Sequence, residues 1–133
     1  MSTNALLAIP CRTDAAGETW HWVYTHWDGY PEWMMPALVE IVQRDGYDTA
    51  IRTLITESPD GWSQINPQFA ASQDTIEGFE IVEGYGTRYD DGSGMALTGT
   101  IDQALDTFPS VEHLFLLERH DLIHLEPNEA VTA

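Results

Sequence analysis

The alternation of apolar and polar positions predicts that the chain begins with two strands. The first covers Ala5 to Cys11, and the second, rich in Trp, Tyr, Val and Thr, covers Thr19 to Trp27. Turn residues between them, Thr13 to Gly17, favour a hairpin. Because side chains alternate along a strand, both faces of the second strand carry aromatic rings. One face must cover a core, and we expect the other to be partly covered or to form a binding surface.

Apolar positions at helical spacing come next and predict two helices. Pro31 suits the first turn of the first helix, and Gly46 ends it. The second helix should follow Asp48, which can cap its first turn. The apolar stripes of the two helices consist of Ala37, Leu38, Ile41 and Val42, and of Ile51, Leu54 and Ile55.

The second half of the chain predicts hairpins around one short helix. Residues 62–78 are mixed and polar, and we expect a loop there. A strand from Phe79 to Tyr89, with a bulge or a close approach of another segment at its glycines, returns through Met95 to Thr98. Thr100 can cap a short helix, and residues 111–125 form a last hairpin.

The predicted order ββαα–ββ–α–ββ indicates an α+β fold. Hairpins point to an antiparallel sheet, and we expect the helices to pack on one face of it. The 133 residues, of which 43% are hydrophobic, suit a single domain. Residues 127–133 should form a frayed tail.

The net charge limits the possible partners. Twenty-two Asp and Glu face five Arg and no Lys, so the formal net charge is −17. Since like charges repel, we expect no direct binding to nucleic acid or to a membrane surface, and a basic protein surface fits better.

The chain carries no targeting signal that we recognise, and Cys11 is its one cysteine. No apolar run approaches the ~20 residues of a membrane-spanning helix. An internal disulfide is impossible with one cysteine, so we expect a cytoplasmic protein. Cys11 itself should be a small apolar core residue, because no sequence signature places a base beside it.

The hexapeptide His26-Trp27-Asp28-Gly29-Tyr30-Pro31 lies where a strand should turn into a helix. In a structural interpretation, Asp28 accepts backbone N–H groups at the helix entry, and Gly29 supplies a positive φ. Trp27 and Tyr30 then anchor the turn in the core, and His26 bonds across the sheet. In a functional interpretation, His26 is a general base or a ligand that Asp28 orients. The structural interpretation is favoured, because each residue has a local reason to be there.

Other candidate chemistry is weak, and we predict no cofactor, no metal and no catalytic residue. The last hairpin contains several possible ligands, but their spacing matches no strong zinc pattern. These residues are His113, Glu118, His120, Asp121 and His124.

The hexapeptide also resembles a signature of small proteins from bacteriophages, prophages and some bacteria. In these proteins a strand ends in His-Trp-Asp-Gly-Tyr-Pro and an acidic residue follows, here Glu32. The resemblance extends to the opening strand, the two helices, a Gly-Tyr-Gly strand like Val82 to Tyr89 and an apolar hairpin like His113 to Leu125. It implies a fold and a phage-like origin, and it brings no catalytic residue with it.

The chain leaves this pattern at Trp33-Met34-Met35, where the family usually continues with glycine and small residues. Consecutive helical positions point about 100° apart, so these three side chains cannot all face one core. An exposed member beside Glu32 would make an apolar patch with an acidic rim. Alternatively, the helix begins at Pro36 and the three residues fold inward as a loop.

The sequence therefore predicts a non-enzymatic, phage-type acidic interaction protein in the host cytoplasm. It would bind and modulate a host protein with a basic or mixed apolar and basic surface, through Glu32, Trp33, Met34 and Met35. A first alternative is a DNA mimic whose carboxylates imitate phosphates. A second is a small enzyme or ligand-binding protein that uses His26, Asp28 and Tyr30.

Overall fold

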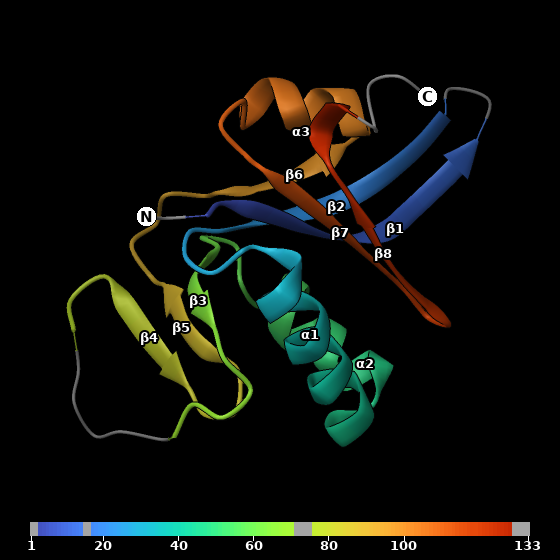
Figure 1. The fold of residues 1–133 in the computed structure, drawn as a ribbon. Coiled ribbons are helices and arrows are strands. Elements are labelled where there is room, and N and C mark those ends of the chain that lie inside the picture. Colours follow the sequence, from blue (N-terminus) through green and yellow to red (C-terminus); the bar gives the residue numbers. More distant parts are fainter. Residues whose placement is uncertain (1–2, 15–16, 71–75, 129–133) are drawn as a thin grey trace.

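The computed structural model describes residues 3–14, 17–70 and 76–128. Side chains are described up to Cys11 in the first range and from residue 18 in the second. Most of the predicted tail at 127–133 lies outside these residues. The elements, shown in Figure 1, are β1 (Ala5–Asp14), β2 (Gly17–Thr25), α1 (Pro31–Asp45), α2 (Tyr47–Ile51), a π-helical turn η1 (Arg52–Thr56), β3 (Trp62–Ile65), β4 (Phe79–Val82), β5 (Gly86–Tyr89), β6 (Ala96–Gly99), α3 (Ile101–Thr107), β7 (His113–Glu118) and β8 (Asp121–Leu125).

The strands form one open mixed sheet in the order β4-β5-β3-β2-β1-β7-β8, and β6 also pairs with β2. The α+β class is confirmed. The sheet differs from the expected antiparallel one, because β1 pairs with β7 in parallel and β2 pairs with β3 in parallel. Both parallel pairs join strands far apart in the sequence, whereas hairpin signals report only neighbouring strands.

Hydrophobic clusters cover both faces of the sheet. Leu7, Val23 and Phe115 pack with α1, α2 and η1 on one face. On the other face Trp22 packs with Ala104 of α3. Figure 1 shows α1 and α2 on one side of the sheet and α3 on the other. Of the two alternatives for the second face of β2, coverage is thus the correct one. Of the two or three helices expected on one face, α1 and α2 lie there, and α3 lies on the other face.

Local signals place the helices well. Helix α1 begins at Pro31 and ends before Gly46, as predicted, and it includes Pro36. A capping box joins Thr100 and Gln103 at the start of α3. The second helix differs from the prediction, because its N-cap is Gly46 and the Asp48 side chain does not cap it. Among the described residues, no helix is long and apolar enough to span a membrane.

The π-helical turn after α2 is stabilised by side chains that follow it in sequence. Widening a helix changes the pairing of its carbonyl groups, which then need other donors. The indole of Trp62 donates to the Leu54 carbonyl at 2.9 Å, and the Ser58 hydroxyl donates to the Thr53 carbonyl at 2.7 Å. Trp62 is fully buried, so its hydrogen bond is shielded from water.

Strand β3 lies inside the segment expected to be a loop. Its buried residues Trp62 and Ile65 are three positions apart, and its register against β5 shifts between Trp62 and Gln64. This irregularity removes the period-two pattern that identifies strands in a sequence. The prediction of a loop at 62–65 is wrong for that reason.

The strand predicted from Phe79 to Tyr89 is instead the hairpin β4–β5, with Gly84 in its turn. Gly86 allows β5 to approach β3, since a Cβ there would lie 2.1 Å from the Gln64 carbonyl oxygen. Strand β6 does not return along this hairpin but pairs with β2, from Trp20↔Gly99 to Val23↔Ala96. The Asp60 carboxylate fixes the connecting loop by accepting backbone N–H groups of Asp91, Gly92 and Gly94.

Replacing Trp62 with Phe should strongly destabilise the protein. Trp62→Phe leaves the buried Leu54 carbonyl without its donor and creates a small cavity, for an expected loss of about 2–4 kcal/mol. Urea unfolding measures this loss. The matched control is Trp27→Phe at an exposed position, for which we expect a change below about 0.5 kcal/mol. Equal effects of the two substitutions would contradict this role of Trp62.

Candidate functional site

The hexapeptide turns from β2 into α1 with Asp28 in the left-handed region, at φ 57°. It is the one described residue other than glycine with a positive φ, and Asp tolerates this region better than most residues. Gly29 has an ordinary φ and is required for space, because a Cβ there would lie 2.6 Å from the Thr3 carbonyl oxygen. The expectation that Gly29 supplies the positive φ is therefore wrong.

Asp28 does not cap α1. The N-cap is Tyr30, and no side chain caps the helix there. Instead, the Asp28 carboxylate accepts a hydrogen bond from the side-chain amide of Gln64 at 2.5 Å. The predicted capping role is thus replaced by a contact with β3, which sequence reasoning had not identified as a strand.

The aromatic residues of the hexapeptide lie at the surface. Trp27 is 44% exposed and Tyr30 is 37% exposed, so they do not anchor the turn in the core as expected. The backbone holds the turn instead, because the N–H groups of His26 and Trp27 donate to the carbonyls of Trp62 and Ser63 at 3.0 and 2.9 Å. The backbone of the motif is therefore fixed while its Trp27 ring faces solvent.

His26, Asp28 and Tyr30 do not converge on one site. His26 bonds through Nδ1 to the hydroxyl of Tyr24 at 2.8 Å and meets the Trp27 ring edge-to-face. This bond joins His26, just after the end of β2, to Tyr24 on the same strand, and not across the sheet as expected. Asp28 faces a groove that neither His26 nor Tyr30 lines.

The groove beside Trp27 has a volume of about 480 Å³. We call it the Trp27 groove. It lies between the end of β2, strand β3 and the β4–β5 hairpin, which Figure 1 shows side by side. Its described lining consists of Trp27, Asp28, Ser63, Gln64, Ile76, Phe79 and Thr87.

The lining combines apolar surface with hydrogen-bond acceptors. Trp27, Phe79 and the 58% exposed Ile76 provide the apolar part. Asp28 is the one charged residue among the described lining residues. Ile76 and Phe79 were not predicted as site residues. In the sequence they are only two apolar residues at the end of a polar segment, which gives no indication of a site.

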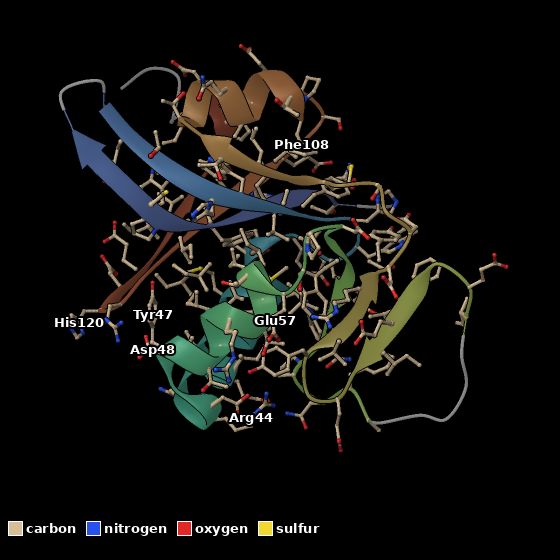
Figure 2. All side chains as sticks on the ribbon, turned by 180° about the vertical axis from the view of Figure 1, so that it is seen from behind. Arg44, Tyr47, Asp48, Glu57, Phe108 and His120 are labelled. Atoms are coloured by element: carbon tan, nitrogen blue, oxygen red, sulfur yellow. The ribbon has the colours of Figure 1, made fainter. Side chains whose placement is uncertain are left out.

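A cluster at the turn of the β4–β5 hairpin joins this hairpin to the end of α1. The guanidinium of Arg44, on α1, donates to the carbonyls of Pro67 and Gly84 at 3.0 and 2.9 Å. Its neighbour Asp45 accepts hydrogen bonds from Arg44 and from the Tyr85 hydroxyl. These bonds lower the pKa of Asp45 to about 2. Figure 2 shows Arg44 between the end of α1 and the β4–β5 hairpin.

The predicted patch at the start of α1 is largely covered. Met34 has no exposed surface, so its assignment to an interface is wrong. Trp33 is half-buried because its indole donates to the Ile65 carbonyl at 2.9 Å, and Met35 packs against the core. Glu32 is exposed and lines with Trp33 a small pocket of about 180 Å³.

The histidines of the last hairpin form a pair rather than a ligand set. His113 Nδ1 and His124 Nε2 are hydrogen-bonded at 2.9 Å, and burial lowers the pKa of His113. His120 is exposed at the turn of the hairpin (Figure 2), and with Glu118 and Asp121 it lines a different pocket. Within the described residues, no three His, Cys, Asp or Glu are placed to hold a metal ion. Cys11 is exposed, which corrects its assignment to the core.

Comparisons with known proteins found no relative of this chain. No model of a protein family, no curated protein and no solved structure matches the chain. The interpretation of the site therefore depends on its own geometry.

The hydrogen bonds of Asp45 predict that the stability of the protein depends on pH. Since the pKa of Asp45 in the folded protein lies below its unfolded value of 3.8, its stabilisation is present above about pH 4 and is lost as the pH falls toward 2. Tyr85→Phe removes one donor and should destabilise the protein by about 1.5 kcal/mol at pH 7.

Urea unfolding at several pH values measures the effect. The difference between Tyr85→Phe and the wild type should shrink as the pH falls from 4 to 2. Tyr30→Phe, at an exposed tyrosine, is the control and should match the wild type throughout. A Tyr85→Phe deficit that stays constant down to pH 2 would show that the Asp45 carboxylate is not involved.

Proposed function

We propose that this protein is a non-enzymatic interaction protein that binds a partner protein through the Trp27 groove. The observation that carries the proposal is the exposed Trp27 ring beside the Asp28 carboxylate at the groove. Through the resemblance of the hexapeptide to phage proteins, we infer that the partner is a host protein, which this protein would modulate.

The surface chemistry supports this kind of recognition. A few buried anchors contribute most of the binding energy in many interfaces, and Trp is enriched among them. The net charge of −17 disfavours anionic partners and accelerates the approach of basic ones. The Trp27 groove therefore takes over the role first expected for Trp33, Met34 and Met35, which are largely covered.

The arrangement favours binding over catalysis. A general base needs its orienting partner within hydrogen-bond reach, and His26 bonds Tyr24 while Asp28 bonds Gln64. The DNA-mimic alternative makes a different prediction from ours. A mimic depends on many carboxylates together, whereas the proposed interface depends on one aromatic side chain.

The test is quantitative capture of partners from a bacterial host lysate on immobilised wild type and variants. Trp27→Ala should lower recovery of the specific partner at least tenfold, which corresponds to about 1.4 kcal/mol. The matched control is Tyr30→Ala, an exposed aromatic residue outside the groove lining, which should retain the partner.

Charge is tested in the same assay. Asp28→Asn should weaken capture, and Asp106→Asn, at an exposed carboxylate on α3, should not. If both substitutions act alike and Trp27→Ala is harmless, the DNA-mimic alternative is the better one. If no protein is enriched on the wild type over a blank surface, the proposal is wrong.

A further inference from the structure

From the contacts around other aromatic–acidic pairs of this chain, we infer that Trp27 and Asp28 bind the guanidinium group of an arginine side chain from the partner. This inference rests on the proposed function and specifies the group that the Trp27 groove recognises.

The chain itself repeatedly places an arginine over an aromatic ring and pairs it with a carboxylate. Arg119 lies over the Tyr47 ring, with its Cζ 4.8 Å from the ring centroid, and bonds Asp48 at 2.7 Å. Tyr47 and Asp48 are adjacent in sequence, as Trp27 and Asp28 are. Figure 2 shows Tyr47 and Asp48 side by side below the hairpin that carries Arg119.

Two further arginines follow the same pattern. Arg44 lies over Tyr85 at 5.3 Å and bonds Asp45, while Arg88 lies over Trp62 at 6.0 Å and bonds Glu80. None of the arginine side chains that the structure describes lies over Trp27. Trp27 and Asp28 therefore offer the same pair of groups to an arginine from another molecule.

Arg88 illustrates why this chain does not satisfy the pair itself. It follows the groove residue Thr87 on β5, and successive side chains of a strand point to opposite faces. Arg88 is accordingly directed to Trp62, Glu80 and Ser58, away from the groove.

The polar atoms of the groove suit a group with many donors and no acceptor. Gln64 donates through its amide nitrogen to Asp28, which leaves its amide oxygen as an acceptor. Asp28 Oδ1 carries no described hydrogen bond, and Ser63 and Thr87 add hydroxyl oxygens. A guanidinium brings five N–H donors in one plane, whereas an ammonium brings three at a point.

The Trp27 ring strengthens the preference for a planar cation. An arginine can stack flat on indole while its edge reaches a neighbouring carboxylate, and this geometry is less favourable for lysine. Asp28 is partly buried, so its attraction to a cation is screened less than that of the exposed Asp48. Trp27 and Asp28 line the same groove, so a cation bound there can contact both the ring and the carboxylate.

The test is an NMR titration with N-acetyl-arginine methylamide, which presents one arginine side chain without a terminal charge. The indole N–H signal of Trp27 and the side-chain amide of Gln64 should shift together and saturate, while the other indole signals stay in place. N-acetyl-citrulline methylamide, which has the same shape without the charge, should not produce saturable shifts. The lysine analogue should bind about fivefold more weakly.

Variants separate the groove from the general acidic surface. Asp28→Asn keeps an acceptor for Gln64 and suits the left-handed backbone, so it should fold normally and weaken binding about fivefold or more. Asp106→Asn removes the same charge elsewhere and should have no effect. Trp27→Ala, followed through the Gln64 amide, should also weaken binding about fivefold.

Equal binding of the arginine and lysine analogues, or shifts spread evenly over exposed carboxylates, would overturn the assignment of a guanidinium site. So would unchanged binding in Asp28→Asn. If the arginine probe fails while Trp27→Ala still abolishes partner capture, the proposed function stands and the guanidinium assignment is wrong. If the probe binds but capture is independent of Trp27, the proposed function is wrong and the guanidinium site remains.

Discussion

The packing of Trp62 is the interaction on which the rest of the structure depends. Its buried indole donates to the Leu54 carbonyl of the π-helical turn, and its own carbonyl accepts the N–H of His26 at the end of β2. One residue thus connects the helical layer to the sheet. Because β3 also pairs with β5, it attaches the β4–β5 hairpin to the central strands. Without β3, the two sides of the Trp27 groove would have no common support.

This constraint explains how the hexapeptide can be rigid and exposed together. Backbone bonds to β3 hold His26 and Trp27, the Gln64 amide holds Asp28, and close contact with Thr3 requires Gly29. None of these interactions uses the Trp27 ring. A structural role for the backbone of the motif is therefore compatible with a binding role for Trp27 and Asp28, since the backbone forms the turn and these side chains line the groove.

The sequence predicts what local rules determine. The β1–β2 hairpin, the stripe and ends of α1, the capping box of α3 and the last hairpin follow from periodicity, proline, glycine and capping residues. Strand β3, the pairing of β6 with β2 and the position of α3 depend on contacts between distant segments. Only part of the candidate site could be predicted, for the same reason. Trp27 and Asp28 belong to a motif, whereas Gln64 and Phe79 reach them only through β3 and β4.

Amide hydrogen exchange of the free protein tests the central claim that β3 fixes the motif at the surface. If β3 holds it, the N–H groups of His26 and Trp27 should exchange as slowly as those in the centre of β2, near the rate set by global unfolding. Exchange of these two amides at rates typical of exposed loops, in a protein whose β2 centre is protected, would contradict the account.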